Sequence, residues 1–425
     1  MVAEPGSTTA FPRSPATFVI LSLAAVTSLI LLFSTMDPWL VNGGIFNGGL
    51  DAHIYRDGAS RILHGRPLYD EPTLRDLLYT YTPFSAIAFT PTNLFPWQAL
   101  TSTWLVLNLL TLFGCIVTSW RMLGYRITPT LLGASAIMTF GCVFLEPVRT
   151  TLYYGQINLI LMLVVLLDFA RPASAKLRGV GVGIAGGIKL VPLFFIVEFA
   201  ALRQWRAAVV ASATFAGTVV GTALLLPVES REYWTSIFFQ SGRIAPDDHP
   251  ANQSLRGLIA HLGGGPAPLW LWALGVGVAV AVGLTVSVAL HRTGERLLSI
   301  TVAGLTACVV SPFSWGHHWV WFVPLLVYIV HRATQSARYW LVALGLSLAI
   351  AAWTYTYLPG WVSVGTFLLP PWWFGAPLMQ NVYVALYVLV IAACARLVYT
   401  NRQGAQALPP SEVEVEIPTP LVAQR

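Results

Sequence analysis

Apolar stretches recur along almost the whole chain, with short polar connections between them. A helix needs about 20 mainly apolar residues to cross the hydrocarbon core of a bilayer. The pattern therefore predicts an all-α, polytopic membrane protein with about 12 transmembrane helices. The expected spans are residues 16–34, 97–119, 128–145, 156–168, 177–188, 190–202, 207–227, 267–290, 297–311, 319–331, 339–356 and 380–399.

A lysine and several prolines interrupt this pattern at two places. The spans on either side of Lys189 are short and Pro192 follows closely, so we expect a broken helix or a shallow hairpin there. Segment 83–96 is apolar but contains three prolines, which favours a re-entrant or juxtamembrane segment. The expected organisation is a cytoplasmic tail at 1–15, a membrane domain at 16–400 and a disordered, Pro- and Glu-rich cytoplasmic tail at 401–425.

Composition and charge support a membrane protein and argue against a nucleic-acid partner. The chain is 56% hydrophobic and 10% charged, with a mean hydropathy of +0.68, whereas soluble domains carry about 25% charged residues. Its net charge of +6 comes from basic residues clustered in short connections, as at Arg171, Lys176 and Arg178. Such clusters mark the cytoplasmic side, which places both termini in the cytoplasm.

Most of the polar residues that could take part in chemistry then lie on the opposite side of the membrane. Five outer segments hold more than half of the 18 acidic residues. They are the loop at 35–96, the connection at 146–155, the tip at Lys189, the loop at 228–266, and the pair 312–318 and 357–379. We therefore expect the active or binding site on the extracytoplasmic side.

Asp51 is the candidate general base. It follows a glycine-rich run soon after the first span, at the membrane boundary. A helix that begins near Asp51 places Tyr55, a candidate substrate-binding residue, on the same face and turns Asp57 elsewhere. A carboxylate in this position can take a proton from a sugar hydroxyl. It can equally serve as a helix N-cap, and the spacing alone leaves both interpretations open.

Lys189 and a pair of histidines are the candidate cations and hydrogen-bond donors. An ionisable group within an apolar stretch is costly and marks a functional site by default, although Lys189 could instead extend to the membrane interface. His317 and His318 are adjacent, and about 100° separates neighbours on a helix, so both cannot easily bind one metal. One of them is expected to contact a phosphate or sugar oxygen. The flanking Trp315 and Trp319 could stack on substrate or form an interfacial belt.

Two outer connections carry further amides and arginines that could contact sugar hydroxyls or anionic groups. Those in the connection at 146–155 and just after it could instead cap helices or join them within the membrane. The match of residues 252–254 to a glycosylation acceptor pattern is short and frequent by chance. The candidates are Arg149, Gln156, Asn158, Asn252, Gln253 and Arg256.

Several familiar motifs are missing from the sequence. It has no P-loop and no HExxH, no G-x-G-x-x-G stands in the strand–turn–helix context that a dinucleotide-binding fingerprint requires, and no DxD pair occurs in the outer loops. This argues against a mechanism that uses a nucleotide sugar and a divalent metal. The four cysteines lie in apolar segments without paired spacing, so neither a disulfide nor a zinc site is expected.

Taken together, these residues resemble the GT-C superfamily of membrane glycosyltransferases over about residues 16–400. The resemblance is greatest to the polyprenyl-phosphate-sugar enzymes of actinobacterial cell-envelope synthesis, in particular the α-1,2-mannosyltransferases of phosphatidylinositol mannoside synthesis. The order and common side of the motifs carry it. They are Asp51 with Tyr55, HGRPLYD at 64–70, YTPF at 81–84, GQIN at 155–158, KLVP at 189–192, NQS at 252–254 and SWGHHW at 314–319.

The resemblance implies a GT-C fold with extracytoplasmic juxtamembrane helices, in the plasma membrane, with its active site on the periplasmic face. It implies that Asp51 takes a proton from a phosphatidylinositol mannoside acceptor, which attacks polyprenyl-phosphate mannose with inversion to form an α-1,2 linkage. Lys189, His317 or His318, and Arg256 would stabilise the phosphate leaving group. Neither a metal nor another cofactor is expected.

Three other functions remain open from the sequence. An arabinofuranosyltransferase that uses polyprenyl-phosphate arabinose would carry nearly the same residues. A lipid or glycolipid transporter predicts ionisable residues near the membrane midplane and repeat symmetry, but Glu198 is the only acid clearly inside an expected span and no internal repeat is evident. A non-catalytic lipid-binding scaffold predicts tolerance to the loss of both Asp51 and Lys189.

Overall fold

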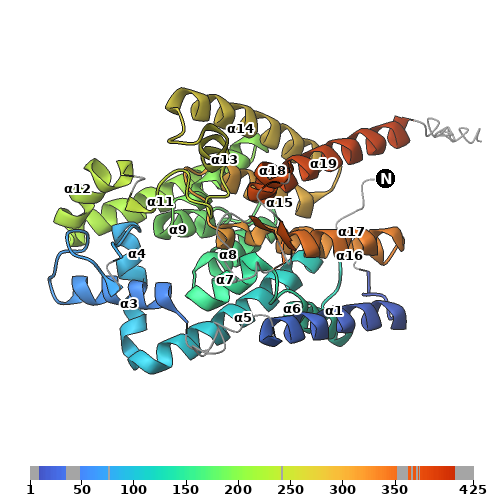
Figure 1. The fold of residues 1–425 in the computed structure, drawn as a ribbon, viewed down its shortest axis with the longest axis horizontal. Helices are drawn as coiled ribbons and strands as arrows, with labels where there is room; N and C mark the ends of the chain where they lie inside the picture. Colours follow the sequence, from blue (N-terminus) through green and yellow to red (C-terminus); the bar gives the residue numbers. More distant parts are fainter. Residues whose placement is uncertain are drawn as a thin grey trace, which may run out of the picture.

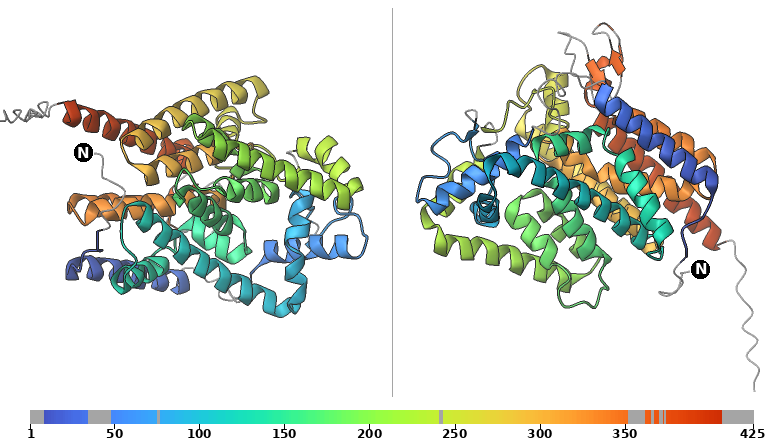
Figure 2. Two further views of the ribbon diagram at one scale, coloured as in Figure 1. Left: turned by 180° about the vertical axis from the view of Figure 1, so that it is seen from behind. Right: turned by 90° about the horizontal axis from the view of Figure 1, so that it is seen from below.

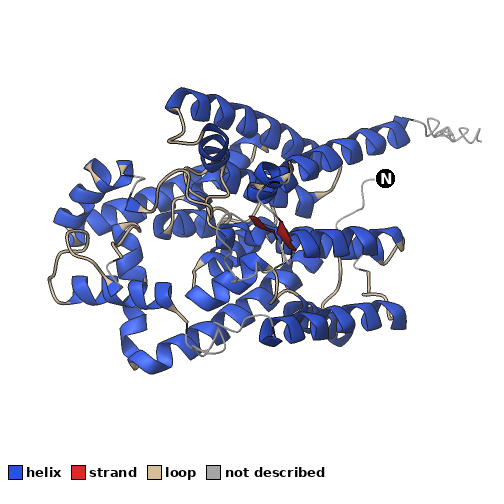
Figure 3. Ribbon diagram, viewed as in Figure 1, coloured by secondary structure: helices blue, strands red, loops and turns tan. Residues whose placement is uncertain are grey.

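Helices form at nearly all of the expected positions in the computed structural model (Figures 1 and 3). The structure describes residues 9–34, 48–74, 77–240, 243–351, 362–364, 367–369, 372 and 374–406. The long apolar helices are α1 (Pro15–Ser34), α5 (Trp97–Met122), α11 (Trp205–Leu225), α14 (Leu269–Arg292) and α19 (Val382–Gln406). The shorter, mainly apolar helices are α6 (Pro129–Gly141), α8 (Asn158–Ala170), α9 (Val180–Ile188), α10 (Phe194–Ala201), α15 (Arg296–Val310), α16 (Phe322–Ala333) and α17 (Arg338–Ala349).

Judged by helix length, fewer helices could cross a membrane than the sequence predicts. Within the described ranges, five helices are long and apolar enough to cross a membrane, or six if α8 and the helix before it form one bent span. The longest of the shorter helices, α15, has 15 residues, which reach about 22 Å, whereas a hydrocarbon core measures about 30 Å. The expected count of about 12 is therefore not confirmed, although the positions of the helices are.

Short helices lie between the apolar ones. Figure 1 shows α3, α4 and α12 at one end of the long axis, while α19 runs toward the other end, and the views in Figure 2 agree. Segment 83–96 folds into two such short helices. The set consists of α3 (Leu50–Leu63), α4 (Pro83–Ala88), α7 (Glu146–Tyr154), α12 (Pro227–Thr235), α13 (Leu255–Gly263) and α18 (Ala376–Gln380), with 3₁₀ helices η3 (Thr90–Leu94), η4 (Val191–Leu193), η5 (Ile237–Phe239) and η7 (Gly316–Trp321).

The core is built around α15 and α16, whose side chains are almost all buried. Around them α14 packs along α15, α11 along α9, α5 along α8 and α1 along α6. Apolar side chains on the outer helices remain exposed, as at Leu224 (80%) on α11 and Leu274 (60%) on α14. Such surfaces are expected of helices that face lipid.

Two segments depart from the prediction. Strands β1 (Val362–Val364) and β2 (Phe367–Leu369) form a short antiparallel hairpin in which Val362 lies opposite Leu369, so the described chain is not purely helical. Helix α19 continues to Gln406, past the expected boundary at 400. The rest of the predicted C-terminal tail lies outside the described residues.

Two buried carboxylates on apolar helices make hydrogen bonds to neighbouring segments. Glu198 on α10 accepts a hydrogen bond from the Ser287 hydroxyl on α14 at 2.5 Å. Asp168 at the end of α8 accepts from the backbone N–H groups of Gly179 (2.9 Å) and Val182 (3.0 Å) at the start of α9. Glu198 is therefore not the only buried acid on an apolar helix, and both acids have structural partners.

Candidate active site

The chain breaks its helical path at Lys189, as the sequence predicts. Helix α9 ends at Ile188, Lys189 is extended, and η4 begins at Val191. The Lys189 Nζ donates a hydrogen bond to Asn158 Oδ1 at 3.0 Å and lies 5.4 Å from the centre of the Tyr81 ring. The Lys189 ammonium is thus held inside the protein by two neighbouring segments, which does not fit a side chain that extends to the interface.

Asn158 connects the lysine to the histidine pair. It begins α8, directly after a bend of 117° between α7 and α8. Gly155 permits this bend, because its φ of 68° is a conformation that favours glycine. The Asn158 Oδ1 accepts from Lys189, and its Nδ2 donates to the carbonyl of His317 at 2.9 Å. Both ends of the amide therefore make contacts within the protein.

Asp51 lies in the first turn of α3, but it is not the N-cap. The N-cap is Gly49, whose φ of 84° favours glycine, and no side chain caps the helix. The side-chain amide of Gln156 acts on the Asp51 carboxylate and lowers its pKa. One turn further on, Tyr55 donates its hydroxyl to Gln156 Oε1 at 3.0 Å. The expected placement of Asp51 and Tyr55 on one face of the helix is therefore confirmed.

The electrostatics show that Asp51, Lys189 and the two histidines share one cluster. Burial raises the pKa of Asp51 to about 6, while the positive charge of Lys189 and the Gln156 hydrogen bond oppose the rise. Burial and the same lysine charge hold the pKa values of His317 and His318 well below the usual 6.5. These groups lie on α3 and in η7, outside the candidate spans. At neutral pH the site thus contains an ionised carboxylate of raised basicity and two neutral imidazoles.

The histidine turn fits tightly against a buried acid. Gly316 begins η7. A Cβ atom added to it would lie much closer than 3.0 Å to both carboxylate oxygens of Glu146, a separation that real Cβ atoms essentially never show. That carboxylate is in turn held by the Tyr383 hydroxyl, which donates to its Oε2 at 2.5 Å. Among the described residues, the buried Nδ1 of His318 has no hydrogen-bond partner. The turn is therefore fixed in place while one imidazole nitrogen is left for a ligand.

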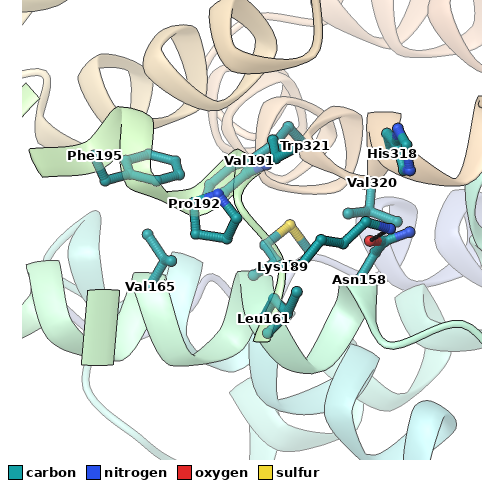
Figure 4. Close-up of a pocket in the computed structure, with 11 residues that line it drawn as sticks. Asn158, Leu161, Val165, Lys189, Val191, Pro192, Phe195, His318, Val320 and Trp321 are labelled. Carbon is teal, nitrogen blue, oxygen red and sulfur yellow. Dashed lines mark hydrogen bonds between the residues drawn. The ribbon is translucent and has the colours of Figure 1, made fainter. Parts of the chain in front are cut away.

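A groove leads away from this cluster. Figure 4 shows Lys189, Asn158 and His318 at one end and Val165 and Phe195 toward the other. The rest of the lining is apolar as well: Leu161, Met162, Val191, Pro192, Val320 and Trp321. The lining thus joins a cation to apolar side chains, which are the contacts that an anionic head and a hydrocarbon chain would make. Within the described ranges, no three or more His, Cys, Asp or Glu side chains gather in a way that could hold a metal ion.

Asn252 and Gln253 hold the histidine turn from a different side. The Oδ1 of Asn252 accepts from the backbone N–H of Ser314 at 3.2 Å, and the N–H of Gln253 donates to the Ser314 carbonyl at 2.8 Å. The Gln253 side chain donates to the Gln380 carbonyl at 2.8 Å. Both residues have no exposed surface. Their contacts fit a structural role in the loop at 228–266 better than direct contact with substrate.

The other candidates lie around the cluster or apart from it. Arg256 on α13 forms an ion pair with Asp247 at 2.9 Å. Arg149 is buried on α7, three residues after Glu146. Trp315 is partly exposed beside the turn. Trp319 has no exposed surface and packs against Phe322 and Tyr383 with ring centres 5.5 and 5.4 Å away.

Three residues at the site have roles that the sequence did not predict. Tyr81 belongs to the YTPF motif, but its position over Lys189 and next to Tyr55 follows from the fold. Glu146 opens an outer segment, and its acidic character was the one available signal. Tyr383 begins the last apolar helix, where nothing in the pattern distinguishes it from a core residue.

Residues 79–312 match the model of glycosyltransferase family 87. Asp51, His317 and His318 lie outside the matched residues. The chain is 32% identical over 315 residues, 72% of each chain, to a polyprenol-phosphate-mannose-dependent alpha-(1-2)-phosphatidylinositol pentamannoside mannosyltransferase of Mycobacterium tuberculosis. A protein of the same name from Mycolicibacterium smegmatis is 31% identical over 377 residues, 86% of each chain.

A third relative is a polyprenol-phosphate-mannose-dependent alpha-(1-2)-phosphatidylinositol mannoside mannosyltransferase, also from Mycolicibacterium smegmatis. It is 32% identical over 339 residues, which cover 73% of this chain and 76% of the relative. No solved structure gives a significant match to the chain.

Proposed function

Since the chain belongs to glycosyltransferase family 87, we propose that it transfers mannose from polyprenyl-phosphate mannose to a phosphatidylinositol mannoside acceptor, with formation of an α-1,2 linkage. The names of the relatives support the donor, the acceptor class and the linkage. The observation that carries the proposal is the cluster of Asp51, Lys189 and His318 beside an apolar groove. It brings a base, a cation and an apolar surface together at one place.

The proposed reaction is a single displacement with inversion. Asp51 accepts the proton of the acceptor hydroxyl as its oxygen attacks the anomeric carbon of the β-linked mannosyl phosphate. The bond between that carbon and the phosphate oxygen breaks, and its electron pair leaves with the phosphate. A raised basicity favours Asp51 as the proton acceptor, because the best general base has a pKa near the working pH.

Lys189 and the histidine turn would bind the donor phosphate. A fixed ammonium beside the leaving group stabilises the charge that develops there, and the Asn158 hydrogen bond orients it. The unpaired Nδ1 of His318, within the described part of the chain, gives a second contact to a phosphate oxygen. Arg256 is left out of this phosphate site, because its guanidinium is already paired with Asp247.

The polyprenyl chain would occupy the apolar groove and continue into the membrane. We further propose that the enzyme lies in the plasma membrane, with the site on the extracytoplasmic face and the basic connections in the cytoplasm. For about 12 crossings in a GT-C arrangement, the shorter apolar helices must cross as well, in a locally thinned bilayer or with flanking residues that extend to the interface.

The test is mannosyl transfer by Asp51→Asn in membranes supplied with radiolabelled polyprenyl-phosphate mannose and the acceptor. We expect loss of transfer, since an amide cannot accept the proton. Asp57→Asn is the matched control, because Asp57 lies on the same helix and pairs with Arg61 instead. Full transfer by Asp51→Asn would overturn the mechanism. Labelled polyprenyl-phosphate arabinose in parallel separates the arabinosyl alternative.

Two observations favour this function over the alternatives of another class. The acids buried on apolar helices, Asp168 and Glu198, accept hydrogen bonds from neighbouring segments and so join helices together, although Glu198 Oε2 has no partner among the described residues. A non-catalytic scaffold needs no carboxylate next to a lysine and two histidines. Loss of transfer in Asp51→Asn with retained lipid binding would separate an enzyme from a scaffold.

A further inference from the structure

Two tyrosine hydroxyls and one side-chain amide form a line of polar groups that ends at Asp51, the proposed general base. The hydroxyls of Tyr81 and Tyr55 lie 3.1 Å apart. The Tyr55 hydroxyl donates to Gln156 Oε1 at 3.0 Å, and the Tyr81 hydroxyl lies 3.4 Å from the same oxygen. Asp51 lies one turn before Tyr55 on the same helix, and the Gln156 amide lowers the pKa of its carboxyl group. Three separate parts of the chain thus meet at the amide of Gln156.

The donor and acceptor properties of these groups give the line a direction. An ionised carboxylate only accepts, so Gln156 must present its NH₂ group to Asp51. Its oxygen is then left for the tyrosines, as the observed contacts require. With one proton on each hydroxyl, Tyr81 can donate to Tyr55 while Tyr55 donates to Gln156. Hydrogen bonds aligned in this way strengthen one another.

Packing leaves this line little freedom to rearrange. Tyr55 has no exposed surface, and its ring stacks on Phe89 with centres 4.3 Å apart and planes 7° from parallel. Gln156 is 3% exposed, and its backbone N–H donates to the carbonyl of Thr151 at 2.9 Å. A rotated amide would place its oxygen against the Asp51 carboxylate and its NH₂ group against the tyrosine hydroxyls.

We propose that Gln156 is a positioning residue for the general base, and that Tyr55 and Tyr81 fix its amide so that the NH₂ group always points at Asp51. The proposal rests on the proposed function, because it assumes that Asp51 accepts the acceptor proton. It replaces the expectation that Gln156 binds a sugar hydroxyl. It also gives Tyr55 and the YTPF motif a role in the reaction without contact with substrate.

The two roles of Gln156 differ in what they change. A donor to the carboxylate stabilises its ionised form, so its loss raises the pKa of Asp51 further above about 6. A sugar contact affects acceptor binding and leaves the titration of Asp51 alone. The pH dependence of kcat/KM reports the first effect, and the KM for the acceptor reports the second.

The experiment compares Gln156→Met, Tyr55→Phe and the unmodified protein in detergent, with polyprenyl-phosphate mannose as donor. We expect the acidic limb of the kcat/KM profile to move to higher pH by about one unit in Gln156→Met. A smaller shift in the same direction is expected in Tyr55→Phe, with little change in acceptor KM in either. Tyr79→Phe is the control, because Tyr79 is equally buried but bonds Ser85 instead.

The outcomes separate this inference from the proposed function. An unchanged acidic limb in both variants, with or without a raised acceptor KM, overturns the positioning role. Tyr55→Phe keeps the test decisive if Gln156→Met fails to fold, because it removes one oxygen atom only. If Asp51→Asn retains transfer, the proposed base itself is wrong, and that result is independent of the behaviour of Gln156.

Discussion

The Gly316→Ala variant tests whether the histidine turn must be seated on Glu146. The added Cβ atom would lie much closer to both carboxylate oxygens of Glu146 than 3.0 Å, the shortest distance that real Cβ atoms show. Glu146 cannot easily give way, because it is buried, its carboxylate is held by Tyr383, and its backbone N–H donates to the Ile350 carbonyl at 2.7 Å. The turn that carries His317 and His318 must therefore move.

The size of the effect follows from the displacement. Relief of the contact requires a shift of about 1 Å, and a misplacement of that size can lower a rate about 100-fold. This corresponds to roughly 2.7 kcal/mol of lost transition-state stabilisation. We therefore expect kcat/KM for mannosyl transfer to fall by about two orders of magnitude, with most of the loss in donor use, since the displaced imidazoles face the phosphate.

The assay is transfer from labelled donor at several donor concentrations, with protein level and thermal unfolding in detergent measured alongside. Gly277→Ala on α14 is the matched control, because nothing lies within 4 Å of a Cβ there. The double variant Gly316→Ala with Glu146→Ala removes the opposing carboxylate and should recover part of the lost activity. Unchanged transfer by a folded Gly316→Ala protein would refute the reasoning.

Three further predictions follow from the same geometry. Transfer by the unmodified protein should rise with pH to a plateau above about 6, because Asp51 must lose its proton to act as a base, and a pH–rate profile shows this directly. Lys189→Met should raise the donor KM about 10- to 100-fold, since a hydrogen bond to a charged group contributes about 1.5–3 kcal/mol; Lys189→Arg, which keeps the charge, should lose less. Tyr383→Phe removes one donor from the buried Glu146 carboxylate and should destabilise the protein by about 1–3 kcal/mol, seen as a lower unfolding temperature than that of the exposed control Tyr399→Phe.

The sequence pattern predicted helix positions well because apolar length and proline placement are local properties. The break at Lys189 and the start of a helix at Leu50 both follow from neighbours in the chain. The number of crossings did not follow, because several apolar stretches end earlier in the structure than their composition suggests. Helix α17, for example, ends at Ala349, short of the expected boundary at 356.

The site could be listed from the sequence but not assembled from it. Asp51 and Lys189 stand out as an acid at a membrane boundary and a lysine in an apolar stretch, whatever their tertiary neighbours. The contact of Gly316 with Glu146 depends on packing between segments far apart in the chain, which no periodicity encodes. For the same reason Asn252 and Gln253 looked like substrate contacts, whereas their partners are backbone groups of other segments.

The spread of the site along the chain has a consequence for biosynthesis. Asp51 comes from the first third of the chain, Lys189 from the middle, and the two histidines from residues 317 and 318. A ribosome releases these segments in that order. A product that terminates between Lys189 and Gly316 contains Asp51 and Lys189 but neither histidine. Premature termination at any point before the histidine turn therefore yields no protein with the complete site, and enzyme activity first becomes attainable late in synthesis.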